Sequence, residues 1–182
     1  LRIQTHCFKI MLGGNFLSLW ELMEKTVVLV KPDGLQRGLV GEIISRFERN
    51  GLKLVAIKMA KMTDEILDQW YAHHKDKDFF SDLKEFMKWT PIVAMVWEGL
   101  EAVAAVRKTV GTTKGREAES GSIRGDFAMS GSQNLIHASD SPETAQRELE
   151  LLFKAEEIIS YESRTECLIY SKEERRRSSK AE

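Results

Sequence analysis

The residues best suited to chemistry lie around one histidine. His137 is at the centre of the stretch from Asn134 to Ser141, which reads Asn-Leu-Ile-His-Ala-Ser-Asp-Ser. An imidazole with one nitrogen held by a carboxylate keeps the other nitrogen free as a nucleophile, which suits a histidine that accepts a phosphoryl group. The small polar residues around the ring favour this role. A single histidine is also compatible with a structural or solvated role, so the residue type alone leaves both open.

A helix is predicted immediately after this segment, and it supplies a carboxylate. Ser141 is a favourable N-cap, and Pro142 fits the first helical turn, where its missing N–H is no loss. From Pro142 to about Phe153 apolar residues recur at helical spacing, and Glu148 falls on the same stripe. We therefore expect Glu148 to lean inward and to hold one nitrogen of His137. The positive end of the helix also favours an anion nearby.

Phosphate binding, if it occurs, must rely on side chains. The sequence contains neither a Gly-x-x-x-x-Gly-Lys-[Ser/Thr] loop nor a Gly-x-Gly-x-x-Gly turn after a strand. Residues that can donate to phosphate oxygens are found at predicted element ends and in loops: Lys31, Arg107, Thr113, Arg124 and Asn134. Guanidinium groups can bind phosphate through two parallel hydrogen bonds. Each residue is a weak signal alone, and Lys31 is equally compatible with a solvated lysine at a strand end.

Composition limits the functional classes. The 182 residues, of which 42% are hydrophobic and 30% charged, fit one globular domain with a sizeable core. A net charge of −1 does not predict a general nucleic-acid binder, and we predict no specific nucleic-acid partner. Cys7 and Cys167 are too few for a disulfide framework and lack zinc-site spacing, which favours the reducing cytoplasm. Apolar runs are strand-sized, so no membrane partner is predicted.

The chain is expected to have three parts. A compact domain is predicted from residue 23 to 170. Residues 1–22 form an N-terminal extension of uncertain status, which is compatible with an extension, a targeting leader or a misplaced start. Residues 171–182 are charged and Ser-rich, and we expect them to be disordered. The basic cluster at Arg175–Arg177 is interpreted as a solvated chain end rather than a nucleic-acid site.

Hydrophobic periodicity predicts the order of the elements. Strands are expected at 26–30, 52–59 and 91–97, with a final strand before the His137 helix. Helices are expected at 39–47, from Thr63, at 79–87 and at 101–110; the second and third form an inserted helical hairpin. The order βαββαβ predicts an α+β fold, with a ferredoxin-like antiparallel sheet and helices on one face. A long polar connection at 111–122 has no clear periodicity.

Four motifs, in order, resemble nucleoside diphosphate kinase. They are Val-Lys-Pro-Asp-Gly-x-Gln-Arg-Gly-Leu at Val30 to Leu39, Val-Ala-Met-Val-Trp-Glu-Gly at Val93 to Gly99, Ile-Arg-Gly-Asp-Phe at Ile123 to Phe127, and Asn-x-x-His-Ala-Ser-Asp-Ser at Asn134 to Ser141. The resemblance covers roughly Glu24 to Tyr170. It implies a ping-pong reaction, in which a nucleoside triphosphate such as ATP phosphorylates His137 and the phosphohistidine then phosphorylates a nucleoside diphosphate such as GDP.

The resemblance also implies roles for individual residues. Contacts to phosphates and ribose would come from Lys31, Tyr71, Arg107, Thr113, Arg124 and Asn134. The base would be clamped by Phe79 and Leu83, and His137 would be tuned by Glu148 and Ser139. Mg²⁺ would arrive bound to the nucleotide phosphates and touch Asp140 through water. The family forms homo-oligomers, which implies a hexamer or a tetramer built from dimers.

Two departures from the family pattern are present, and the first of them, together with the basic cluster at Arg175–Arg177, motivates a second hypothesis. Lys114-Gly115 stands where the family commonly has Asn-Pro, and Asp78 stands where many members have proline. A binding or regulatory protein that keeps the nucleotide pocket but turns over poorly, and that associates with nucleic acid, is the alternative to the active enzyme. A third possibility, phosphorylation of protein histidines from His137, is compatible with the enzyme.

Overall fold

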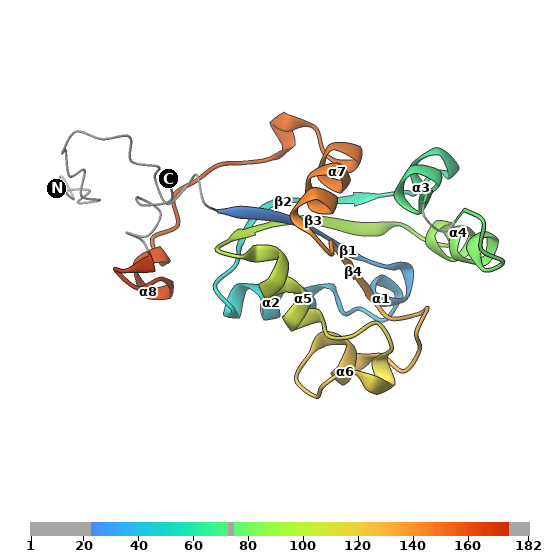
Figure 1. Cartoon of the computed structure of the whole chain (residues 1–182), viewed down its shortest axis with the longest axis horizontal. Helices are drawn as coiled ribbons and strands as arrows, with labels where there is room; N and C mark the ends of the chain where they lie inside the picture. Colours follow the sequence, from blue (N-terminus) through green and yellow to red (C-terminus); the bar gives the residue numbers. More distant parts are fainter. Residues whose placement is uncertain (1–22, 73–74, 175–182) are drawn as a thin grey trace.

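A single antiparallel sheet forms the centre of the molecule. The computed structural model describes residues 23–72 and 75–174. The sheet has the strand order β2-β3-β1-β4 (Figure 1). Its strands are β1 (Glu24–Val30), β2 (Lys53–Ala60), β3 (Ile92–Gly99) and β4 (Ile136–Ala138). Each neighbouring pair is antiparallel, so the predicted sheet is confirmed.

Helices connect the strands and cover the sheet. Before β3 the chain forms α1 (Pro32–Gln36), α2 (Val40–Arg49), α3 (Asp64–Trp70) and α4 (Phe80–Lys88). After β3 it forms α5 (Ala102–Val110), α6 (Ile123–Phe127), α7 (Pro142–Leu152) and α8 (Glu166–Ile169), with short 3₁₀ turns η3 (Gly115–Glu117) and η4 (Ala155–Glu157). The βαββαβ order and the α3–α4 insertion agree with the sequence-based expectation.

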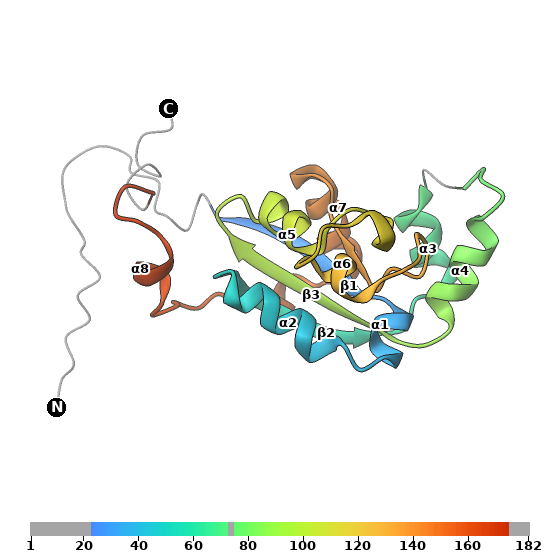
Figure 2. The same cartoon turned by 90° about the horizontal axis from the view of Figure 1, so that it is seen from below.

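The expectation that helices cover only one face of the sheet is wrong. Along β1, Val28 and Val30 pack with α2 and α5, whereas Val27 and Leu29 pack with residues of α3 and α7 on the other face. In Figures 1 and 2, α7 lies on one side of the strands and α2 and α5 lie on the other. Because β1 and β3 are apolar on both faces, a single helical layer would leave one face of the sheet exposed to water.

The helix boundaries follow from local capping. Ser141 Oγ accepts a hydrogen bond from the Thr144 N–H at 3.1 Å, which fixes the start of α7 as predicted. Thr63 caps α3 in the same way. Gly51 adopts a φ of +83° just after α2, a conformation that favours glycine. The turn expected after β1 is instead the short helix α1, because Pro32 suits its first position.

Some predicted features fall outside the described residues. These are the extension at 1–22, two residues of the polar stretch at 73–74, and the tail at 175–182. The four preceding tail residues, 171–174, are exposed. None of the helices within 23–72 and 75–174 combines the length and the apolar character required to span a lipid bilayer.

Candidate active site

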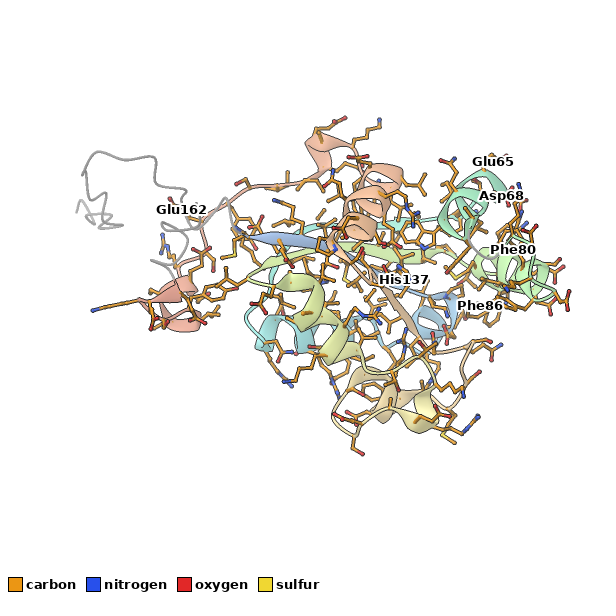
Figure 3. The ribbon with its side chains drawn as sticks, viewed as in Figure 1. Glu65, Asp68, Phe80, Phe86, His137 and Glu162 are labelled. Carbon is orange, nitrogen blue, oxygen red and sulfur yellow. The ribbon has the colours of Figure 1, made fainter. Side chains whose placement is uncertain are left out.

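β4 places His137 beside the helical layer of α3 and α7. His137 pairs with Leu29 of β1 in the antiparallel register. Its neighbours Ile136 and Ala138 point into the core formed with α2 and α5. Because side chains alternate along a strand, His137 points to the opposite face, where its side chain is 23% exposed (Figure 3). The imidazole is therefore partly enclosed but remains accessible.

A buried carboxylate fixes the orientation of the imidazole. His137 Nε2 lies 2.9 Å from Glu148 Oε1 on α7, and Ser139 Oγ donates to the other Glu148 oxygen at 2.7 Å. Glu148 is only 3% exposed, so the predicted inward-leaning carboxylate is present. A carboxylate acceptor at Nε2 places the ring proton on that nitrogen and leaves the Nδ1 lone pair free. This is the geometry that a nucleophilic imidazole requires.

Two aromatic residues at the end of α3 adjoin this pair. The Trp70 ring meets the His137 ring edge to face, with 5.2 Å between centroids. Tyr71 is buried, and burial together with the negative charge of Glu148 raises the pKa of its hydroxyl. Tyr71 therefore keeps its proton and can act as a donor. Sequence reasoning did not assign Trp70 to the site, because an aromatic residue on an apolar helix face is usually a core residue.

Lys31 and Asn134 form the second part of the site. Lys31, which directly follows β1, donates from Nζ to Asn134 Oδ1 at 2.9 Å and to the Ser132 carbonyl oxygen at 2.6 Å. Asn134 Nδ2 in turn donates to the Thr113 carbonyl oxygen at 2.8 Å. Burial lowers the pKa of Lys31 to about 8, with an opposing contribution from Asp33. The ammonium group thus has neutral hydrogen-bond acceptors that an anion can replace.

Arginine residues add positive charge to the same region. Arg124 donates from Nη2 to the Ile136 carbonyl oxygen at 2.7 Å and from Nη1 to the Gly111 carbonyl oxygen at 2.9 Å, which anchors it next to β4. Its pKa is lowered to about 10 by burial and by the neighbouring charge of Arg107. The two positive guanidinium groups repel each other, and an anion that binds between them relieves this repulsion.

Asp140 lies at the exposed rim of the site. A hydrogen bond from the Thr144 side chain lowers its pKa, and the positive charge of Arg107 acts in the same direction. Asp140 is therefore a carboxylate at neutral pH, and its surroundings place it near both the histidine and an arginine. Within the described parts of the chain, no group of three or more His, Cys, Asp or Glu side chains is arranged to hold a metal ion.

The aromatic end of α4 lies next to Lys31. The Phe86 ring centroid is 5.2 Å from Lys31 Nζ (Figure 3). Phe79 and Leu83 precede Phe86 by seven and three residues, so they fall on the same side of the helix. Leu83 packs on the core beneath, whereas Phe79 is 50% exposed. The predicted base-clamping pair is thus on the same side of α4 as Phe86.

The departures from the family pattern leave the loop after α5 well packed. Gly115 N–H donates to the Ser130 carbonyl oxygen at 3.2 Å, and a side chain at Gly115 would collide with the Ala128 backbone. Lys114 and Glu117 make an exposed ion pair. Thr113, although exposed, has its carbonyl oxygen held by Asn134. The loop therefore positions residues of the site without the usual proline.

The chain is similar to known proteins over most of its length. The family model described as nucleoside diphosphate kinase matches residues 24–158. A nucleoside diphosphate kinase of Staphylothermus marinus is 55% identical over 138 residues, which cover 76% of this chain and 98% of that protein. One from Parabacteroides distasonis is 50% identical over 152 residues, which cover 84% and 99% of the two chains.

Solved structures agree with this result. The structure of a halophilic nucleoside diphosphate kinase from Halobacterium salinarum in complex with CDP has a TM-score of 0.79 and is 41% identical, covering 81% of this chain and 99% of that one. A nucleoside diphosphate kinase family protein from Babesia bovis has a TM-score of 0.78 and 46% identity. The chain therefore belongs to the nucleoside diphosphate kinase family and is an enzyme that transfers a phosphoryl group from a nucleoside triphosphate to a nucleoside diphosphate.

Proposed function

We propose that His137 carries the phosphoryl group between the two nucleotides and that its Nδ1 atom is the nucleophile. The single observation that carries this proposal is the 2.9 Å contact between His137 Nε2 and Glu148 Oε1. The contact fixes the tautomer and leaves only Nδ1 for attack. Ser139 holds the second oxygen of the same carboxylate, so it supports the orientation of Glu148.

The reaction has two mirrored steps. In the first step, the Nδ1 lone pair forms a bond to the γ-phosphorus of the nucleoside triphosphate, the bond from that phosphorus to the bridging oxygen breaks, and the nucleoside diphosphate leaves. The imidazole gains positive charge, which the Glu148 carboxylate stabilises. In the second step, a terminal oxygen of another nucleoside diphosphate forms a bond to the phosphorus of the phosphohistidine, the bond from that phosphorus to Nδ1 breaks, and the imidazole regains its lone pair. In-line positioning and positive groups are what this transfer needs from the protein.

Phosphate oxygens are bound by donors from separate elements. We assign the contacts with the phosphates and the ribose to Lys31, Tyr71, Arg107, Thr113, Arg124 and Asn134. In the free enzyme Lys31 donates to Asn134 and to a backbone carbonyl oxygen, and nucleotide binding exchanges these neutral acceptors for phosphate oxygens. The protonated Tyr71 hydroxyl donates near the histidine, and the two arginines neutralise charge on the transferring group.

The base is held by stacking rather than by reading its edges. Phe79 and Leu83 clamp the ring from α4, and Phe79 is exposed enough to offer its face. Stacking on an aromatic side chain tolerates every base, so donor and acceptor nucleotides of different base identity fit one pocket. The CDP in the Halobacterium salinarum structure supports a nucleoside diphosphate as the acceptor class.

Mg²⁺ enters as part of the nucleotide substrate. Asp140 fits this ion because it is exposed, ionised and close to His137, and one carboxylate with phosphates and water is a usual magnesium environment. We assign Asp140 a contact through water. When bound, Mg²⁺ supplies charge neutralisation on the phosphates.

We also propose that the chain works as a homo-oligomer in the cytoplasm. The assembly is a tetramer or a hexamer built from dimers, and light scattering distinguishes the two. In its support, β2 is an edge strand of the sheet, and Ile57 and Met59 on it are 49% and 63% exposed. The exposed Cys167 thiol is free, which suits a reducing compartment.

Phosphorylation of His137 can be tested directly. The enzyme is incubated with γ-labelled ATP and Mg²⁺, separated from nucleotide, and mapped for an acid-labile label, which is then chased with GDP. We expect the label on His137 and its transfer to GTP. His137→Ala should lose the label and at least about 10⁴-fold of the exchange rate, because the covalent intermediate cannot form.

The control variant is His6→Ala, which changes a histidine that precedes the family match at residues 24–158. It should keep both the label and the exchange activity. Label on another histidine would reassign the nucleophile. Nucleotide binding with no label on the parent enzyme would overturn the proposal and favour a binding protein that retains the fold.

A further inference from the structure

Leu135, two residues before His137, is held in place by the segment Lys31–Gly34, which includes the start of α1. The Lys31 backbone N–H donates to the Leu135 carbonyl oxygen at 2.8 Å, and Asp33 Oδ2 accepts a hydrogen bond from the Leu135 N–H at 2.9 Å. Gly34 allows this approach, since a Cβ there would lie 2.8 Å from the same carbonyl oxygen. Both backbone polar groups of Leu135 are therefore satisfied by the Lys31–Gly34 segment.

Leu135 needs such support because its backbone is strained. Its φ is +73°, in the left-handed region that non-glycine residues rarely adopt, and its side chain is fully buried. The residue stands between Asn134, whose side chain binds Lys31, and Ile136, whose carbonyl oxygen binds Arg124. Its conformation therefore sets the direction in which Asn134 and His137 are presented.

Asp33 also acts on Lys31 through its charge. Of the charged groups that act on the Lys31 ammonium, Asp33 from α1 raises its pKa and Arg124 from α6 lowers it, while burial is the largest effect and lowers it. The other groups around the ammonium are neutral: the Asn134 amide, a backbone carbonyl oxygen and, from α4, the Phe86 ring. Asp33 is thus the nearby negative charge that keeps this buried lysine protonated.

We propose that Asp33 is a positioning residue for phosphoryl transfer, which acts through two neighbours without touching the nucleotide. One carboxylate oxygen holds Leu135 in its left-handed conformation, and the negative charge keeps Lys31 as an ammonium. The inference rests on the proposed function of Lys31 and His137. Asp33 Oδ1 is buried and has no hydrogen-bond partner in the described structure, so the carboxylate is retained at a cost in stability.

Two substitutions separate the two roles. Asp33→Asn keeps an oxygen that can accept from the Leu135 N–H but removes the charge, whereas Asp33→Ala removes both. Without the charge the pKa of Lys31 should fall further, by about one unit. Asp33→Asn should therefore keep kcat/KM within about threefold of the parent at pH 6.5 and lose nearly tenfold at pH 8.5. Asp33→Ala should lose about 10²-fold at pH 6.5, because the histidine segment is no longer held, and nearly tenfold more at pH 8.5, because the charge is removed as well.

The matched control is Glu157→Gln. Glu157 also accepts a backbone N–H, from Lys154 at 2.7 Å, and pairs with a lysine, Lys58 at 2.7 Å, but it lies on η4 away from the site. This variant should have the kcat/KM and pH profile of the parent. Thermal unfolding of each variant shows which fraction is folded, and rates are expressed per folded enzyme.

A parental pH profile for Asp33→Asn would overturn the electrostatic role. An unchanged kcat/KM for folded Asp33→Ala would overturn the backbone role. If Asp33→Ala does not fold, Asp33→Asn still tests the charge, and Asp33→Glu tests the backbone role by displacing the accepting oxygen, which should lower kcat more than it raises KM. Phosphorylation of His137 in the parent enzyme is measured in parallel. If the parent carries no label on His137, the proposed function is wrong; if it carries the label, the variants test this inference alone.

Discussion

Two lysines at opposite ends of the sheet, Lys31 and Lys53, have different partners. Lys31 follows the last residue of β1, and its ammonium donates to the Asn134 side-chain oxygen and to a backbone carbonyl oxygen. Lys53 is the first residue of β2, at the other end, and lies 2.8 Å from Glu98 Oε1. Glu98 also pairs with Lys25 at 2.9 Å. One lysine therefore has neutral acceptors, and the other has a carboxylate.

The difference distinguishes the lysine that we propose for phosphate binding from a lysine in a structural ion pair. Lys31 gains attraction when a phosphate replaces its neutral acceptors. Lys53 would have to give up an ion pair whose desolvation cost has already been offset in the folded state. The surroundings of Lys53 agree with a structural role: the Tyr161 ring centroid lies 4.9 Å from the ammonium group, and Glu166 adds a second carboxyl group, whose pKa burial raises. A buried lysine with no direct carboxylate partner is thus the better indicator of an anion site.

Removing the carboxylate at the structural end should have the largest effect on stability. Glu98→Gln removes the carboxylate that pairs with both Lys25 and Lys53, and we expect a loss of about 3 kcal/mol in the free energy of unfolding. Folded enzyme should keep its kcat/KM. Urea denaturation with parallel kinetics measures both quantities. Glu157→Gln, which disrupts a more exposed pair, should lower the free energy of unfolding less, and an equal loss in both variants would contradict the comparison.

The same kind of change at the other end should affect activity instead. Lys31→Met removes the ammonium and keeps much of the side-chain volume, so kcat/KM should fall about 10²-fold through lost charge stabilisation of the phosphates. The free energy of unfolding should stay level or rise, because the cost of burying a charge disappears. Steady-state kinetics and denaturation measure this. Severe destabilisation with normal activity would show that Lys31 is a structural residue.

A change of pH should distinguish the role of Lys31 from that of the ion pairs at the other end of the sheet, without any mutation. Because burial lowers the pKa of Lys31 to about 8, kcat/KM should fall as the pH rises through that value, by about tenfold at pH 9. Between pH 8 and the ordinary lysine value of 10.5 the unfolded chain binds a proton that the folded chain does not, so the stability contribution of this lysine rises as activity falls. A pH-rate profile flat to pH 10 would contradict this assignment.

The stability contribution of Glu98 changes in the acidic pH range rather than in the alkaline range. Burial raises its pKa, but hydrogen bonds from Lys53 and Lys25 outweigh that effect and hold the pKa below its usual value. A carboxyl group with a lowered pKa contributes stability above its unfolded pKa, and this contribution is lost as the pH falls through the folded value. At neutral pH the parent should therefore have a higher free energy of unfolding than Glu98→Gln. As the pH falls through the folded pKa of Glu98, the free energies of unfolding of the two proteins should converge.

Local sequence patterns were sufficient for the elements and for one catalytic contact. The Ser141 cap and the apolar stripe placed Glu148 on the buried side of α7, only eleven residues from His137, so the short connection limited where the carboxylate could lie. The residues that we propose for phosphate binding follow from the four sequence motifs. Their convergence depends on strand pairing between β1 and β4, which joins positions more than a hundred residues apart, as in the contact of Lys31 with Asn134.

Other features depend on backbone geometry that the residue types do not predict. The left-handed conformation of Leu135 is unusual for a leucine, and nothing in its spacing predicted it. The Phe86 ring reaches Lys31 because α4 packs beside α1. The second helical layer was missed because the sheet was assigned from element order alone, although the continuous apolar character of β3 already indicated burial on both faces.

The smallest expected effect tests whether the two ends are independent. Tyr161 donates from its hydroxyl to the Leu54 carbonyl oxygen at 3.0 Å, and its ring covers Lys53. Tyr161→Phe removes one hydrogen bond and keeps the ring, so the free energy of unfolding should fall by about 1 kcal/mol or less. Neither kcat/KM nor the alkaline limb of its pH profile should change. Because β1 runs from one end to the other, a shifted alkaline limb in this variant would mean that the strand transmits the change to Lys31.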